Sequence, residues 1–94
     1  MRFVIDNIKV NHLNLMRRLG YHPHKRNQSF ARRLSSNEFP RFHVYLKDKA
    51  DGLEFSLHLD QKGACYEGHT AHSGDYDAET LEQEKSRIIS LLNT

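Results

Sequence analysis

The chain has 94 residues, one cysteine and a net charge of +2, with 37% hydrophobic and 28% charged residues. This length allows one domain, residues 1–94, and excludes a buried cofactor pocket with a domain of its own. One cysteine excludes an internal disulfide, and the longest apolar run, residues 3–5, is too short to span a membrane. We therefore expect a cytoplasmic protein that does not contact membranes.

The charge is divided unevenly along the chain. Residues 1–47 hold ten Lys and Arg against two Asp and Glu, whereas residues 48–94 hold four against ten. A basic cluster within residues 17–41 attracts phosphate even though the total charge is small. The alternative is that the basic half packs its rim against the acidic half.

The first element that the pattern indicates is a helix. Residues 1–10 fit either a short strand or the lead-in to a helix, and their pattern does not decide between them. Asn11 is a suitable N-cap, apolar residues follow at helical spacing, and Gly20 is a natural stop. The sequence predicts a helix over 11–19.

The middle of the chain predicts strands. Residues 20–29 indicate a loop and residues 29–34 a strand. Residues 41–47 and 53–60 alternate apolar and polar side chains, which is typical of strands with one wet face. The turn-rich connection 48–52 joins these two into an antiparallel hairpin.

The last third predicts a loop and a helix. Residues 63–76 contain three glycines without an apolar period, and long loops of this kind are often functional. Residues 78–92 form a helix capped by Asp77. The order predicts an α+β fold: a two-layer α-β-β-β-α arrangement with a three-stranded antiparallel sheet and two helices on one face.

The register of the hairpin can be predicted as well. Apolar side chains must share one face, and one of the registers that satisfy this rule also forms two charge pairs. A tighter register would place Arg41 opposite His58 and form no charge pair. The preferred register pairs Lys47 with Glu54, Tyr45 with Ser56, His43 with His58 and Arg41 with Asp60. It places two histidines side by side, exposed on the face opposite the core.

Those two histidines are candidate catalytic residues. His43 and His58 could transfer protons at a phosphodiester without a metal, because imidazole titrates near neutral pH. Arg41 and Lys47, with Tyr45 between them, would stabilise the charge on phosphorus. The alternative is a solvated sheet face that happens to be polar.

The basic cluster is a candidate RNA-binding surface. Basic residues interleaved with an aromatic ring and imidazoles suit contacts to the RNA backbone and stacking on bases. The candidate residues are Arg17, Arg18, Tyr21, Lys25, Arg26, Arg32 and Arg33. The alternative is a solvated surface loop.

A third group of residues suits a metal. His58, Asp60, His69 and His72 provide imidazole and carboxylate ligands for a divalent transition metal such as zinc. The alternative is that the loop histidines bond to backbone groups, and the spacing matches no strong zinc signature.

Two resemblances add to these patterns. Residues 58–62, 66–68 and 71–77 resemble a His-Leu-Asp-Gln-Lys…Ala-His-Ser-Gly-Asp-Tyr-Asp pattern of small uncharacterised bacterial proteins. The order of elements, with Arg-Arg-Leu-Gly-Tyr at residues 17–21, resembles the double-stranded-RNA-binding fold. HicA-type messenger-RNA-cleaving toxins share that fold and carry a histidine on the sheet, but this chain lacks their Gly-Ser-His-His element.

The leading hypothesis from the sequence is therefore RNA binding with metal-independent ribonuclease activity. The second is a histidine-rich metal-binding protein or metal-dependent hydrolase. The third is a protein-interaction module.

Overall fold

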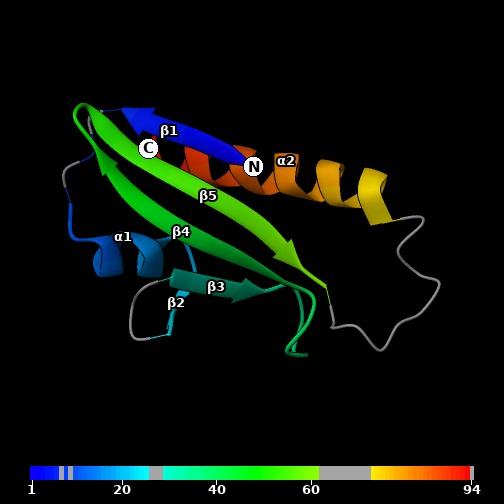
Figure 1. Ribbon diagram of the computed structural model, residues 1–94. Helices are drawn as coiled ribbons and strands as arrows, with labels where there is room; N and C mark the ends of the chain where they lie inside the picture. Colours follow the sequence, from blue (N-terminus) through cyan, green and yellow to red (C-terminus); the bar gives the residue numbers. More distant parts are fainter. Residues whose placement is uncertain (7, 9, 26–28, 62–72, 94) are drawn as a thin grey trace.

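The computed structural model describes residues 1–6, 8, 10–25, 29–61 and 73–93, with the backbone alone for 73–76. These residues form two helices and one five-stranded antiparallel sheet of order β1-β5-β4-β3-β2 (Figure 1). The elements are β1 (Arg2–Asp6), α1 (His12–Arg18), β2 (His22–His24), β3 (Ser29–Arg33), β4 (Arg41–Lys49), β5 (Gly52–Asp60) and α2 (Ser73–Leu92). The predicted α+β class is confirmed.

The prediction of a three-stranded sheet is wrong, because β1 and β2 add an edge strand on each side. β1 lies along β5, where Phe3 stacks on Phe55 with ring centroids 5.1 Å apart. β2 lies in the segment predicted to be a loop and has only three residues, with Pro23 in the middle. An edge strand tolerates proline because one side of its backbone needs no partner.

The first helix begins and ends as its sequence indicates. The Asn11 side chain caps α1 by accepting a hydrogen bond from the Asn14 amide at 3.1 Å. Gly20 follows the helix with a φ of 90°, a conformation that favours glycine. The Tyr21 amide then donates to the Met16 carbonyl at 2.9 Å, which closes the helix in the manner of a C-terminal cap.

The second helix begins earlier than predicted. α2 starts at Ser73, so Asp77 lies inside it and is not its cap. Most of the predicted loop 63–76 lies outside the described residues. Of the two helices in the described part of the chain, neither combines the length and the apolar character that a membrane crossing requires.

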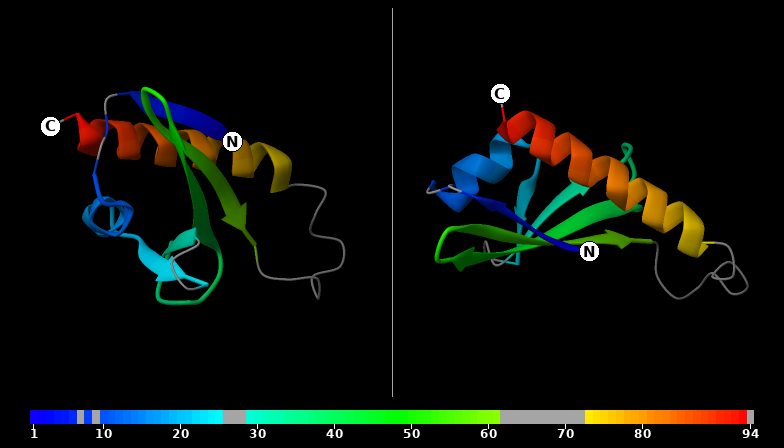
Figure 2. Two further views of the ribbon diagram at one scale, coloured as in Figure 1. Left: turned by 60° about the vertical axis from the view of Figure 1, so that its left-hand side comes forward. Right: turned by 90° about the horizontal axis from the view of Figure 1, so that it is seen from above.

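Both helices pack on the same face of the sheet, and Figure 2 shows α2 running along that face. Alternate residues of each strand point into this layer, as the period of two requires. The core consists of Phe3, Leu15, Met16, Leu19, Tyr21, Phe30, Phe42, Val44, Leu53, Phe55, Leu57 and Ile88. The remaining strand residues point to the opposite face, here called the open face, which neither helix covers.

Candidate nucleic-acid interface

The predicted register of the hairpin is confirmed at every pair. Lys47 lies opposite Glu54, Tyr45 opposite Ser56, His43 opposite His58 and Arg41 opposite Asp60. β4 and β5 are longer than predicted, and Lys49 pairs with Gly52 across a tight turn. Arg41 also forms its expected ion pair, with Nε 3.3 Å from Asp60 Oδ2. The second expected charge pair differs: among the described residues Glu54 forms an ion pair with Lys49, at 4.0 Å, and not with Lys47.

A row of rings crosses the open face from β2 to β5. The His24 and His43 centroids are 5.0 Å apart and their planes are almost perpendicular, at 80°. His43 stacks on Tyr45 at 4.9 Å and 28°, and Tyr45 meets His58 edge-on at 6.0 Å. We call these four residues the ring row. Tyr45 is 43% exposed and His58 is exposed, so this end of the row faces solvent.

The prediction that both histidines are exposed is wrong for His43, which is 7% exposed. Its Nδ1 lies 3.1 Å from Asp60 Oδ2, and its Nε2 lies 2.7 Å from Ser29 Oγ. The neighbouring strands therefore contact both ring nitrogens, while His24 and Tyr45 pack against the ring itself.

Burial favours the neutral form of His43. Burial lowers the pKa of His43 from its ordinary value, against the opposing effect of the Asp60 carboxylate. A neutral ring satisfies both contacts if Nδ1–H donates to Asp60 and Nε2 accepts from the Ser29 hydroxyl, in place of the longer 3.5 Å hydrogen bond from that hydroxyl to the His24 carbonyl. The ring at the centre of the row is thus fixed by its neighbours, and its neutral form is favoured.

This arrangement limits what His43 can do as a catalyst. With both nitrogens engaged, it has no free position for proton transfer at a phosphodiester beside His58. The order Asp60, His43, Ser29 is that of a hydrolase triad, but Ser29 is 0% exposed and its hydroxyl cannot reach a substrate. In this structure the chain of hydrogen bonds positions the His43 ring.

The basic residues predicted to bind RNA are divided between two faces. Arg33 is exposed on β3 opposite Arg41, and therefore lies on the open face. Lys25 is exposed in the turn after β2, and Lys47, predicted as a catalytic residue, is exposed on β4. Arg17 and Arg18 are exposed at the end of α1, and Arg26 lies outside the described residues.

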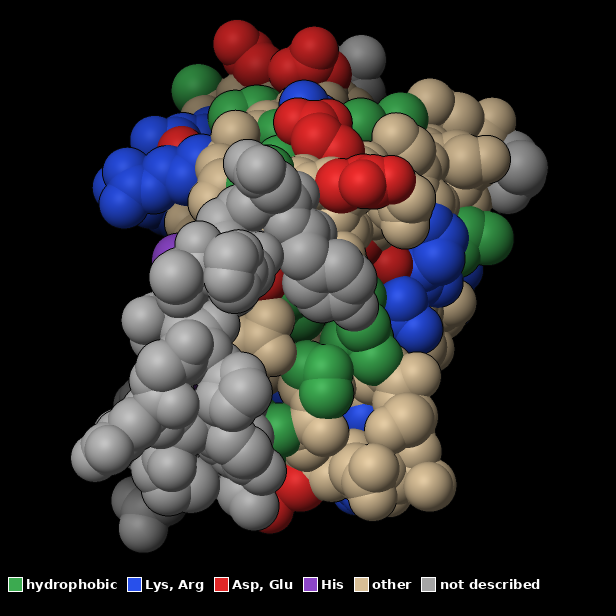
Figure 3. Space-filling view, turned by 90° about the vertical axis from the view of Figure 1, so that its right-hand side faces the viewer, with side chains coloured by type: hydrophobic (Ala, Val, Ile, Leu, Met, Phe, Trp, Pro, Cys, Tyr) green, Lys and Arg blue, Asp and Glu red, His purple; other side chains and the backbone are tan. Residues whose placement is uncertain are grey.

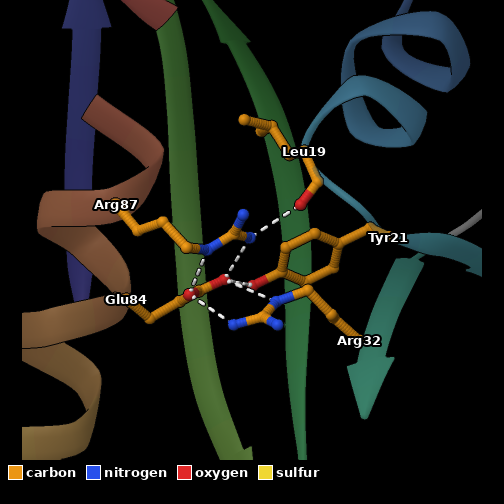
Figure 4. A network of polar contacts seen from close by, with 5 residues as sticks. All are labelled: Leu19, Tyr21, Arg32, Glu84 and Arg87. Atoms are coloured by element: carbon orange, nitrogen blue, oxygen red, sulfur yellow. Dashed lines mark hydrogen bonds and ion pairs between the residues drawn. The ribbon is translucent and has the colours of Figure 1, made fainter. Parts of the chain in front are cut away.

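Two of the predicted RNA-binding residues contact Glu84 of α2 instead: Tyr21 is buried and Arg32 is half-buried. Tyr21 is 0% exposed and donates its hydroxyl hydrogen bond to Glu84 at 2.6 Å (Figure 4). Arg32 donates to both carboxylate oxygens of Glu84, at 2.8 and 3.2 Å. Tyr21 therefore presents no surface to RNA, and the guanidinium of Arg32 is paired with Glu84 while part of its side chain remains exposed.

Glu84 is the centre of a polar network that the sequence analysis missed. Arg87 donates to both of its oxygens, at 2.7 and 2.9 Å, and also to the Leu19 carbonyl at 2.6 Å (Figure 4). Burial alone would raise the pKa of Glu84, but hydrogen bonds from Arg87, Arg32 and Tyr21 outweigh it and hold that pKa below its ordinary value. The signal was present in the sequence, because Glu84 lies on the same helical stripe as Leu81 and Ile88.

The proposed metal ligands are only partly described. His58 and Asp60 lie two residues apart on the open face, whereas His69 and His72 lie outside the described residues. Within the described ranges, no group of three or more His, Cys, Asp or Glu is placed to hold a metal ion. The Arg41 guanidinium beside Asp60 also disfavours a second cation there.

Acidic side chains are exposed on α2. Figure 3, viewed from the end where α2 begins, shows acidic side chains gathered in its upper part and Lys and Arg at the flanks. Glu79 and Glu82 are exposed on α2. The exposed carboxylates of α2 therefore disfavour phosphate contacts at the helix.

Comparison with known proteins adds no family to this geometry: no protein-family model, no curated protein and no solved structure matches the chain.

Proposed function

We propose that the chain binds single-stranded RNA on the open face of its sheet. The observation that carries this proposal is the ring row, which ends in two rings, Tyr45 and His58, that face solvent on an uncovered sheet. Unstacked RNA bases pack on such rings, and each base stacked on an aromatic side chain contributes about 1–3 kcal/mol.

The fixed centre of the row supports this role. The His43 ring stacks beneath Tyr45 and is itself held by Ser29 and Asp60. A ring that is already oriented loses little conformational entropy when a base packs on it. The surface is therefore preorganised for stacking.

Cations around the row supply phosphate contacts. Arg33, Lys47 and Arg2 are exposed on the same face, on β3, β4 and β1. They border the row on several sides, which suits a backbone that passes across the strands. Because the bases of a duplex are already stacked on one another, this surface favours single strands over duplexes.

The proposal is for binding without cleavage. The catalytic hypothesis needs two histidines that exchange protons with the substrate, and His43 has both nitrogens engaged. Labelled RNA incubated with the protein should therefore remain intact. Cleavage that is lost in His58→Ala and in His43→Ala would restore the ribonuclease hypothesis.

The binding test uses fluorescence anisotropy of a labelled single-stranded RNA of about ten nucleotides. Tyr45→Ala should weaken binding about tenfold, whereas Tyr45→Phe, which keeps the ring, should bind within about twofold of the wild type. Ser56→Ala is the matched control, because Ser56 lies opposite Tyr45 on the same face and has no ring.

Salt and competition complete the test. Affinity should fall steeply between about 50 and about 200 mM salt, and a duplex of the same sequence should compete poorly. No binding at low salt would end the proposal, as would equal losses in Tyr45→Ala and Tyr45→Phe, since the ring would then have no role.

A further inference from the structure

The outer edge of β1 has unused hydrogen-bonding groups. β1 is the last strand of the sheet, and no described strand lies beyond it (Figure 1). It has no proline or bulge in Arg2–Asp6, and these are two of the devices that commonly protect an edge. The edge can therefore accept another strand.

The hydrogen bonds to β5 determine which residues of β1 face outward. Met1 and Leu57 exchange both of their backbone bonds, at 3.0 and 2.7 Å. In an antiparallel pair such residues alternate, so the amides and carbonyls of Phe3 and Ile5 also face β5. The Ile5 carbonyl indeed lies against Gly52 of β5. The backbone groups of Arg2, Val4 and Asp6 consequently point away from the sheet.

The side chains of Arg2, Val4 and Asp6 are complementary to those of a second, antiparallel copy of β1. Arg2 and Asp6 are exposed, and within the described part of the chain neither has an ion-pair partner. Val4, halfway between them, is an exposed hydrophobic residue at 48%. An antiparallel copy of β1 centred on Val4 would place Arg2 opposite Asp6 at both ends.

We propose that two copies of this chain associate through β1, related by a two-fold axis beside Val4. Each Val4 then exchanges backbone bonds with Val4 of the second copy, and each Arg2 pairs with Asp6 of the second copy. The interface is isologous, which is the usual form of a homodimer. The two sheets join into one, with the helices of both copies on the same side.

The same register satisfies backbone, charge and apolar contact together. A shift by two residues would move Val4 off the axis and leave Arg2 and Asp6 of both copies without charged partners. Opposite charges directly across an antiparallel pair stabilise it by about 0.2–1 kcal/mol each. Because one short strand from each copy buries little area, the dimer is weak and dissociates at low concentration.

Sedimentation equilibrium of the protein without RNA tests this proposal independently of the proposed function. From about 10 μM to about 1 mM, the range suited to a small interface, the wild type should pass from monomer to dimer. Arg2→Asp and Asp6→Arg should each raise the dissociation constant at least about tenfold, because like charges then face each other twice. The double variant should restore it to within about threefold of the wild type.

Arg18→Asp is the matched control, because Arg18 is exposed on α1 and its reversal changes the net charge by the same amount as Arg2→Asp. This variant should dimerise like the wild type. Unfolding midpoints should agree for all variants at a concentration where each is monomeric. A wild type that stays monomeric to about 1 mM, or a double variant that fails to recover, would overturn the proposal.

Discussion

The covered and open faces of the sheet each contain a buried titratable side chain, and the two are held in different ways. Glu84 is 2% exposed on the covered face and accepts hydrogen bonds from Tyr21, Arg32 and Arg87. His43 is 7% exposed on the open face and contacts Ser29 and Asp60.

Glu84 and His43 differ in charge and in the groups that lie next to them. Glu84 is ionised, and its partners come from α2, from β3 and from the residue before β2, so it ties the second helix to the sheet. His43 is neutral, and the ring beyond it faces solvent. The buried Glu84 therefore stabilises the fold on the covered face, whereas the buried His43 orients the rings on the open face.

The largest loss of stability is expected when Glu84, on the covered face, is replaced. Glu84→Gln should lower the free energy of unfolding by about 3 kcal/mol, the lower end for a broken buried ion pair, because Arg32 and Arg87 remain partly exposed. Urea denaturation measures it. Glu82→Gln, on the exposed side of α2, is the control and should change little. A loss below about 1 kcal/mol at Glu84 would mean that the network does not secure α2.

A smaller loss of stability is expected when His43, on the open face, is replaced. His43→Ala should lower the free energy of unfolding by about 1–3 kcal/mol, because the Ser29 hydroxyl and the Asp60 carboxylate lose a partner. The same denaturation experiment checks it, with His58→Ala as the exposed control. Equal stabilities of the two variants would contradict the fixed role of His43.

The two centres should also respond to acid in different pH windows. The folded pKa of His43 lies below 6.5, so its contribution is complete above that pH and decreases as the pH falls from 6.5 through the folded value. The folded pKa of Glu84 lies below 4.5, so its contribution to stability is complete above pH 4.5. This contribution decreases as the pH falls from 4.5 through the folded pKa.

Unfolding curves at a series of pH values separate these windows. The difference in stability between the wild type and His43→Ala should decrease as the pH is lowered from 7 through the folded pKa of His43, and the corresponding difference for Glu84→Gln should decrease only below about 4.5. If the difference in stability between the wild type and His43→Ala does not vary between about pH 7 and the folded pKa of His43, the ring is not held neutral.

The smallest effect on stability is expected at Tyr45. Its ring is 43% exposed on the open face, so Tyr45→Ala should alter the free energy of unfolding by only about 0.5 kcal/mol. Thermal unfolding checks it beside the binding measurement. A loss as large as that of His43→Ala would indicate that the ring supports the fold and would make weaker RNA binding uninformative.

The sequence was sufficient to predict the hairpin in detail. The alternation over residues 41–47 and 53–60 determines the faces, and the charges of Arg41 and Asp60 select the register. The first helix followed equally from Asn11 and Gly20. These features depend on residues close in sequence or on a pattern that repeats over many residues.

The features that escaped prediction depend on contacts between distant segments. β2 has a His-Pro-His sequence with no strand pattern, and it exists because β3 pairs with it. The alternation in β4 predicts that His43 is exposed. It is buried because Ser29 contacts it from β3, and the register of β3 against β4 could not be predicted. Tyr21 and Arg32 look like RNA ligands until α2 brings Glu84 to them.

The most direct test of the account is nuclear magnetic resonance of the aromatic rings during titration with single-stranded RNA. Base stacking shifts the ring protons of the surface it covers. If RNA binds to the open face, the Tyr45 and His58 ring signals should move with increasing RNA, together with the amides of β4 and β5, while exposed amides of α2 around Glu79 and Glu82 stay in place. Changes confined to α1 and α2, with the Tyr45 and His58 rings unmoved, would contradict it.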